Sequence, residues 1–347
     1  MAGARAVPRS LNGSGPDRFL WALDKVAVGM EWLQRNSRRR PVTPVDRDLR
    51  LEVAEVRAEA DDVVGLRLVG DGLLPAWQPG AHLDLVLPSG RTRQYSLCGQ
   101  PGDRRSYRIA VRRIADGAGG SREVHDVLRP GSRITARGPR NAFPFITAEK
   151  YLFIAGGIGI TPILPMVRTA AARGADWRLV HTGRSRESMP FLDELSELDP
   201  ARVWIRPDTE FGIPASGAEL LEHTPPGAAV YCCGPIPMIT GVRVDLPGSA
   251  ADSLHWERFS APPINDGRPF TVELARTGRT VQVPADRSAL EAITEVLPQV
   301  SFSCRQGFCG TCHVRVLDGE VEHRGRAAGD HMAICVSRSE GHVVLDL

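Results

Sequence analysis

The feature that most constrains the fold is a group of cysteines near the C-terminus, SCRQGFCGTC, with a fourth cysteine at Cys335. Cys304, Cys309 and Cys312 have the spacing C-x4-C-x2-C, which is typical of a plant-type [2Fe–2S] ferredoxin. The last two of these cysteines also begin C-x-x-C-H, the attachment signature of a c-type haem. Four thiolates would also suit a tetrahedral zinc ion.

The iron–sulfur interpretation is favoured because it uses all four cysteines. A haem would leave Cys304 and Cys335 without a role, and the basic N-terminus lacks the uninterrupted apolar stretch of an export signal. Small residues between the cysteines suit a loop whose backbone N–H groups point at cluster sulfurs. Zinc is disfavoured by the C-x4-C spacing and by the domains upstream. We therefore predict a [2Fe–2S] cluster on Cys304, Cys309, Cys312 and Cys335, with His313 at the surface.

Length, composition and charge narrow the class of protein. The 347 residues suffice for two or three domains, and 42% hydrophobic with 24% charged residues is a globular composition. A net charge of +2, without basic clusters interleaved with aromatic residues, argues against a nucleic-acid binder. No run approaches the roughly 18 apolar residues that cross a bilayer. We expect a cytoplasmic monomer without a transmembrane segment.

The hydrophobic pattern changes several times along the chain. It indicates an N-terminal extension (1–45), an antiparallel β-barrel (46–147), a doubly wound α/β domain (148–259), a linker (260–268) and a β-grasp-like C-terminal domain (269–347). The extension contains an amphipathic helix over 17–34, which would pack on its own protein, dock a partner or lie on a membrane surface. The C-terminal domain begins with a hairpin that turns at Thr277-Gly278.

The α/β domain contains two glycine-containing turns that follow strands. In AGGIGITP, Thr161 is a plausible N-cap and Pro162 suits a first helical turn, so that the helix would offer free N–H groups to a pyrophosphate. Alone, this turn would equally serve a structural role. YCCGPIPM ends a later strand, and ligands of open α/β sheets bind at the carboxyl edge of the strands. The two turns together predict a dinucleotide site.

The barrel has a second set of candidate binding residues. Arg93 offers a permanent charge to a phosphate, and the helix start at Gly120 and Ser121 offers N–H donors. Tyr95 would cover an aromatic ring or, equally, be an ordinary core tyrosine, and Ser96 would bond a ring nitrogen. Two further cysteines, Cys98 and Cys232, suit small buried positions.

The ordered motifs RQYSLC, GGSREVHD, AGGIGITP, YCCGP and the C-terminal cysteine spacing resemble the phthalate dioxygenase reductase family, over about residues 46–347. The resemblance implies FMN in the barrel, NADH in the α/β domain and a plant-type ferredoxin at the C-terminus. FAD stays open, because related reductases with the same barrel bind it. NADPH also stays open, because Arg184, Ser185 and Arg186 would accept a 2′-phosphate. The implied activity is to split a hydride from NADH into single electrons for an external acceptor.

The resemblance also implies individual roles. The residues next to the reacting rings would be Ser96, Thr161, Cys233 and Phe259. The flavin would contact Arg93, Tyr95, Ser96, Ala110, Arg112, Gly120 and Ser121. NADH would contact Gly156, Gly157, Gly159, Thr161, Pro162, Arg184, Ser185, Cys233, Gly234 and Pro235. The acceptor would be a Rieske-type oxygenase, with a cytochrome P450 as the alternative. A non-enzymatic redox sensor with the same cofactors is a hypothesis from another class.

Overall fold

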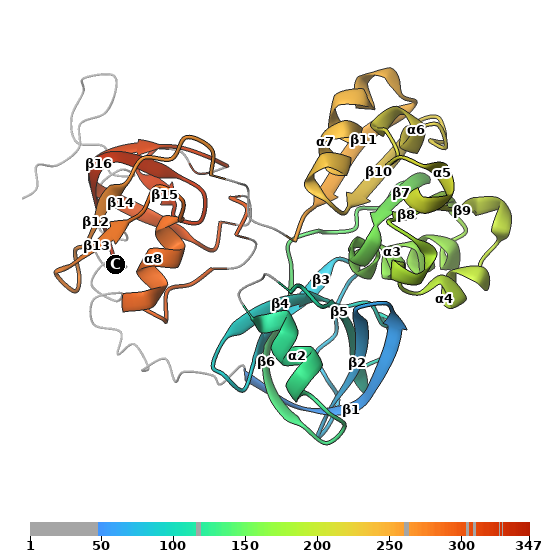
Figure 1. The fold of residues 1–347 in the computed structure, drawn as a ribbon, viewed down its shortest axis with the longest axis horizontal. Coiled ribbons are helices and arrows are strands. Elements are labelled where there is room, and N and C mark those ends of the chain that lie inside the picture. The colour runs from blue at the N-terminus through green and yellow to red at the C-terminus, as the bar shows by residue number, and fades with distance from the viewer. Residues whose placement is uncertain are drawn as a thin grey trace, which may run out of the picture. The chain divides into compact units, whose positions relative to one another are not determined.

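The computed structural model describes residues 48–347 apart from 116–118, 260–263, 303, 304, 308, 309, 326 and 328. The predicted helix of the N-terminal extension, and the cluster ligands Cys304 and Cys309, lie outside the described residues. Three sheets organise the rest (Figure 1). No helix of the described part is long and apolar enough to cross a membrane.

The first sheet is the predicted antiparallel barrel. Its strands are β1 (Asp48–Ala60), β2 (Val63–Gly70), β3 (Ala81–Val86), β4 (Thr92–Ser96), β5 (Ser106–Arg112) and β6 (Arg133–Asn141), in the order β4-β3-β6-β1-β2-β5. A bridge between Leu97 and Ile109 joins the two edges, which closes the sheet. Closure removes the exposed strand edges on which other chains could pair. Helix α2 (Gly120–Val127) lies between β5 and β6 and buries Val124 in the barrel core.

On β3, the polar residues His82 and Asp84 flank Leu83 and are buried with it, since each is only 5% exposed. Asp84 is held there by hydrogen bonds from Arg140 and Gln94. A buried carboxylate needs such partners, because leaving its charge unpaired away from water is costly.

The second sheet is parallel throughout. It contains β7 (Lys150–Gly156), β8 (Asp176–Gly183), β9 (Val203–Pro207), β10 (Ala228–Cys233) and β11 (Ala251–Glu257), in the order β11-β10-β7-β8-β9. Its helices are α3 (Ile160–Ala172), α4 (Leu192–Ser196), α5 (Asp208–Phe211), α6 (Gly217–Leu221) and α7 (Ile236–Asp245). The strand order reverses between β7 and β10. Ligands of such sheets bind in the crevice at this reversal, outside the carboxyl ends of the strands.

The third sheet is mixed, in the order β13-β12-β16-β14-β15. Its elements are β12 (Phe270–Leu274), β13 (Arg279–Val283), α8 (Ala289–Val296), β14 (His313–Glu322), β15 (His331–Ala333) and β16 (Arg338–Leu345). The predicted hairpin is present, with Gly278 at φ +65° between β12 and β13. Ser288 and Glu291 form a reciprocal capping box that begins α8. The predicted fold class, a barrel followed by α/β and β-grasp-like domains, is confirmed.

Candidate functional site

The two glycine-containing turns meet at the strand reversal of the parallel sheet. Cys233 at the end of β10 pairs in register with Ala155 on β7. A Cβ added to Gly159 would overlap the carbonyl of Cys233, and one added to Gly156 would lie 2.6 Å from Cδ of Pro235. Only residues without a side chain allow these backbones to approach so closely. The structure thus brings together the predicted dinucleotide residues Gly156, Gly159, Cys233 and Pro235.

The predicted N-cap role of Thr161 is wrong. Helix α3 begins at Ile160 after a single 3-10 turn, and Gly159 occupies the cap position without a side-chain hydrogen bond. Thr161 is the second helical residue, and its hydroxyl donates to the carbonyl of Ile158 at 3.0 Å. The glycines before it carry the chain into the helix, so no capping side chain is needed. Pro162 lies in the first helical turn, as expected.

A cavity of about 230 Å³ opens where the barrel meets the start of α3. All seven residues predicted to contact the flavin line it, together with Thr161 and Phe259. The lining residues are Arg93, Gln94, Tyr95, Ser96, Ala110, Val111, Arg112, Ile114, Gly120, Ser121, Ile158, Thr161 and Phe259. Gln94, Val111, Ile114 and Ile158 were missed, although three of them adjoin a predicted residue in the chain and Ile114 lies two residues after Arg112. Phe259 is 51% exposed, which leaves an aromatic face accessible to a ligand.

The polar end of this cavity combines a guanidinium with a helix start. Nε of Arg93 lies 2.6 Å from the position that a Cβ on Gly120 would take, so Gly120 is required for their contact. The Ser121 hydroxyl accepts a hydrogen bond from the N–H of Ile114 at 3.0 Å, which fixes its orientation. A phosphate placed here would meet both a cation and free N–H groups. Burial raises the pKa of Tyr95 to about 12 against the opposing effect of Arg93, so its phenol stays neutral.

Cys233 has an acidic neighbour that the sequence reasoning did not identify. Glu257 at the end of β11 pairs in register with Cys233 and is only 9% exposed. Burial raises the pKa of Glu257 to about 8. Burial, and secondarily the Glu257 carboxyl, raise the pKa of the Cys233 thiol well above its ordinary value. A neutral thiol beside a nicotinamide ring would act by packing rather than as a thiolate nucleophile.

The segment after β8 contains the residues weighed for nucleotide preference. Arg184 is exposed, and Ser185 forms a capping box with Ser188 at the 3-10 turn of residues 186–188. Arg186 is paired through two nitrogens with the carboxylate of Glu210, which follows β9. The sequence analysis did not predict Glu210, because it follows β9 whereas Arg186 follows β8, and the two residues come together only in the folded protein.

Two of the four predicted cluster cysteines lie within the described residues and come together. Sγ of Cys312 lies 3.1 Å from Sγ of Cys335, and both residues are buried. Gly307 and Gly310 have φ of +85° and +77°, which bends the loop backbone in a way that residues with a Cβ rarely adopt. No group of three His, Cys, Asp or Glu ligands occurs among the described residues, which exclude Cys304 and Cys309. Two buried cysteine sulfurs in close contact, one of them at the end of a glycine-containing loop, fit an iron–sulfur cluster.

A second cavity, of about 490 Å³, connects the barrel with the cysteine loop. Arg93, Gln94, Ser96 and Phe259 line it as well as the flavin cavity, and Cys335 lines it from the C-terminal domain. The side-chain amide of Gln306 donates to the carbonyl of Arg258. The sequence analysis did not predict Gln306, Arg305 and Arg258 as site residues, because local motifs do not indicate contacts between distant parts of the chain.

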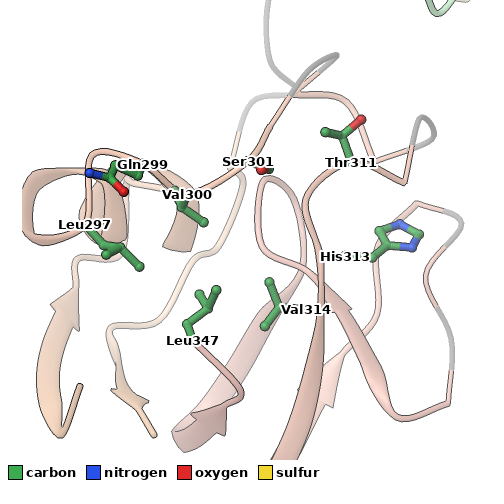
Figure 2. A pocket seen from close by; sticks show the side chains of 8 residues that line it. All are labelled: Leu297, Gln299, Val300, Ser301, Thr311, His313, Val314 and Leu347. Atoms are coloured by element: carbon green, nitrogen blue, oxygen red, sulfur yellow. The ribbon is translucent and has the colours of Figure 1, made fainter. Parts of the chain in front are cut away.

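His313 departs from its predicted surface position. It is only half-exposed, and its Nε2 atom is buried. Figure 2 shows its ring among the eight side chains around a pocket of about 250 Å³ in the C-terminal domain. The neighbouring Cys312 belongs to the buried core of the domain, whereas His313 lines this pocket together with Val314 and Leu347. Thr311 lines the same pocket.

Comparison with known proteins gives the class. Residues 272–340 match the family model described as a 2Fe-2S iron-sulfur cluster binding domain. Phthalate dioxygenase reductase of Burkholderia cepacia is 36% identical over 315 residues, which cover 86% of this chain and 97% of that protein. A solved phthalate dioxygenase reductase, described as modular for electron transfer from pyridine nucleotides to [2Fe–2S], covers 87% of this chain and 98% of its own, with 35% identity and a TM-score of 0.70.

A second kind of relative contains the same module within a longer chain. An intact type IV self-sufficient cytochrome P450 monooxygenase matches 91% of this chain but only 44% of its own, with 35% identity and a TM-score of 0.70.

These relationships define the class as flavin- and iron–sulfur-dependent reductase components of oxygenase systems. Within that class, the chain belongs to the phthalate dioxygenase reductase family. The predicted activity, an oxidoreductase that passes electrons to an oxygenase, is therefore confirmed, as are the predicted cofactors, a flavin, NADH and a [2Fe–2S] cluster.

Proposed function

We propose that this reductase supplies a Rieske-type terminal oxygenase, with FMN in the cavity of the barrel and the cluster on Cys304, Cys309, Cys312 and Cys335. The observation that carries the proposal is the pair of cavities that share Arg93, Gln94, Ser96 and Phe259. One cavity reaches the nucleotide turn at Thr161, and the other reaches Cys335. The chemistry that the bound groups supply is the conversion of one hydride into two single electrons.

In this proposal the chain's residues bind, orient and exclude water. Arg93 and the start of α2 bind the flavin phosphate, and Tyr95 and Ser96 line the ring. Phe259 covers the face at which the nicotinamide arrives, while Thr161 and Cys233 fix that ring. The proposed nucleotide contacts also include Gly157, Pro162, Arg184, Ser185 and Gly234. We also propose the five segment boundaries predicted from the sequence, a monomeric state and a cytoplasmic location.

A Rieske-type partner is supported by relatives named as dioxygenase reductases. The cytochrome P450 monooxygenase that carries a similar module supports a P450 partner as the second candidate. A redox sensor would oxidise NADH slowly and need no oxygenase. Reconstitution with each class of oxygenase distinguishes the three, because only the true acceptor accelerates NADH oxidation coupled to product.

An anaerobic titration of the purified protein with NADH tests the core of the proposal. We expect a flavin-plus-cluster absorption that bleaches within seconds, with about three electrons taken up per chain, two by a flavin and one by a [2Fe–2S] cluster. A flavin spectrum without the broad cluster absorption, together with bound zinc, would contradict the proposed cysteine ligands. A protein that holds FAD after gentle purification would contradict FMN.

A further inference from the structure

Arg305 occupies an unusual position in the loop that carries the predicted cluster ligands. It lies between Cys304 and Cys309 in the sequence, and its backbone is in the left-handed region at φ +54°. This conformation is unfavourable for a residue with a Cβ, and residues held there concentrate at functional sites. The guanidinium carbon lies 4.5 Å above the ring of Phe302, which fixes the side chain against an apolar surface.

Arg305 lines a partly enclosed cavity that it shares with a predicted cluster ligand. This cavity, of about 490 Å³, is also lined by Cys335 and Arg93. Burial, followed by the repulsion of Arg93, lowers its pKa, while Glu291 and Cys335 act in the opposite direction. An arginine stays charged despite such a shift, so a permanent cation faces a predicted cluster ligand.

Two carboxyl groups line the same cavity, those of Glu291 and Glu257, and neither cancels this cation. Glu291 is exposed, and its carboxylate already accepts hydrogen bonds from the backbone N–H and the hydroxyl of Ser288 in the capping box of α8. Charges in contact with water are screened far more than partly buried charges. Glu291 therefore opposes the Arg305 charge only weakly, and burial raises the pKa of Glu257 to about 8, which keeps that carboxyl mostly protonated at neutral pH.

We propose that Arg305 raises the reduction potential of the [2Fe–2S] cluster. Reduction adds one electron and thus one negative charge to the cluster, with no bond broken and no proton required. A cation held beside Cys335 stabilises this added charge by Coulomb attraction in a space where water is limited. Electron transfer from the flavin side to the cluster is correspondingly favoured. The inference rests on the proposed cysteine ligand set.

The test is a potentiometric titration of the holoprotein, followed by the electron paramagnetic resonance signal of the reduced cluster. Arg305→Met removes the charge but keeps a long apolar side chain over Phe302, whereas Arg305→Lys keeps the charge. Arg315→Met is the matched control, since Arg315 is 61% exposed and pairs with Asp330 on the surface of the same domain. We expect a lower cluster potential in Arg305→Met only, with an unchanged flavin potential in all variants.

Two results would overturn the proposal: an unchanged potential in Arg305→Met, or an equal fall in Arg305→Lys, which would show that geometry and not charge matters. Arg305→Asn is a second neutral variant, because asparagine tolerates the left-handed backbone. If both neutral variants fail to hold a cluster, the residue maintains the loop and the tuning role is wrong. Absence of a cluster from the wild-type protein would instead contradict the proposed function.

Discussion

The side-chain amide of Gln306, in the cysteine loop, donates a hydrogen bond to the backbone carbonyl of Arg258, one residue before Phe259. Arg258 follows the last strand of the parallel sheet, and Phe259 lines the flavin cavity. One hydrogen bond therefore links the loop of the predicted cluster to the segment that covers the predicted flavin site. Phe259 lines both the flavin cavity and the cavity that contains Cys335. We therefore expect this hydrogen bond to influence the distance between the flavin and the cluster.

Replacement of Gln306 by alanine is expected to slow electron transfer from flavin to cluster without affecting hydride transfer into the flavin. A typical intramolecular hydrogen bond contributes about 1 kcal/mol. Some molecules have the cysteine loop in contact with Arg258 and others do not. Loss of the hydrogen bond lowers the ratio of the first to the second by up to about fivefold. Anaerobic stopped-flow absorbance resolves the two steps. Gln282→Ala, at an exposed position of β13 in the same domain, is the control. Equal rates in all three proteins would show that the contact does not position the loop.

The contact between Gly159 and Cys233 predicts a different defect. A Cβ in Gly159→Ala would overlap the backbone of Cys233, so either the turn before α3 or the end of β10 must move. Forced overpacking of this kind costs about 1–3 kcal/mol. We expect a lower thermal unfolding midpoint and slower hydride transfer from NADH.

The same substitution at Gly248 is the matched control for Gly159→Ala. Gly248 lies in the same domain, and no atom lies within 4 Å of an added Cβ. Gly248→Ala is expected to leave stability and hydride transfer unchanged. If Gly159→Ala behaves in the same way in both measurements, the close approach of the two turns does not form the nucleotide site.

Glu257 predicts a pH dependence of stability with a definite sign. Its pKa is about 8 when folded, against an ordinary value of 4.5, because burial penalises the charged carboxylate. The folded state therefore binds the proton more tightly, and its stabilising effect is complete below pH 4.5 and lost as the pH rises to 8. Between these two pH values the free energy of unfolding falls by up to about 1.4 kcal/mol per pH unit.

Glu257→Gln should remove this part of the pH dependence, because a neutral amide cannot ionise. Thermal unfolding midpoints between pH 5 and pH 9 measure it, and the variant should gain relative to wild type as the pH rises. Glu197→Gln removes an exposed carboxyl from the same domain and should run parallel to wild type. A constant difference between Glu257→Gln and wild type across this range would contradict the raised pKa.

The sequence predicted those parts of the site that lie within single motifs. The strand-to-helix turns are short-range patterns of glycine, proline and hydrophobic residues, and the structure brings their residues to the strand reversal. Glu257, Glu210 and Gln306 were missed, because each acts through a neighbour from another strand or domain. Thr161 was assigned the wrong local role, because two glycines can begin a helix as well as a capping side chain can. Long-range register and domain contact are not encoded in local spacing.

The ion pair between Arg186 and Glu210 predicts how nucleotide preference would change. Nε and one Nη of Arg186 already contact the Glu210 carboxylate, which would also repel a 2′-phosphate. Glu210→Gln releases Arg186, so we expect kcat/KM to rise for NADPH and not for NADH. Exposed ion pairs are typically worth 1 kcal/mol or less, so the gain should be up to about fivefold.

A matched control for Glu210→Gln is Asp176→Asn. Asp176 is paired with Arg202 in a similarly exposed ion pair, but it lies at the start of β8, at the opposite edge of the sheet. Its loss should leave the ratio of NADPH to NADH turnover unchanged, as measured by steady-state oxidation with ferricyanide as acceptor. Higher salt should reduce the gain in Glu210→Gln, because it screens the exposed Arg186. A gain for both nucleotides, or for neither, would place the 2′ position away from Arg186.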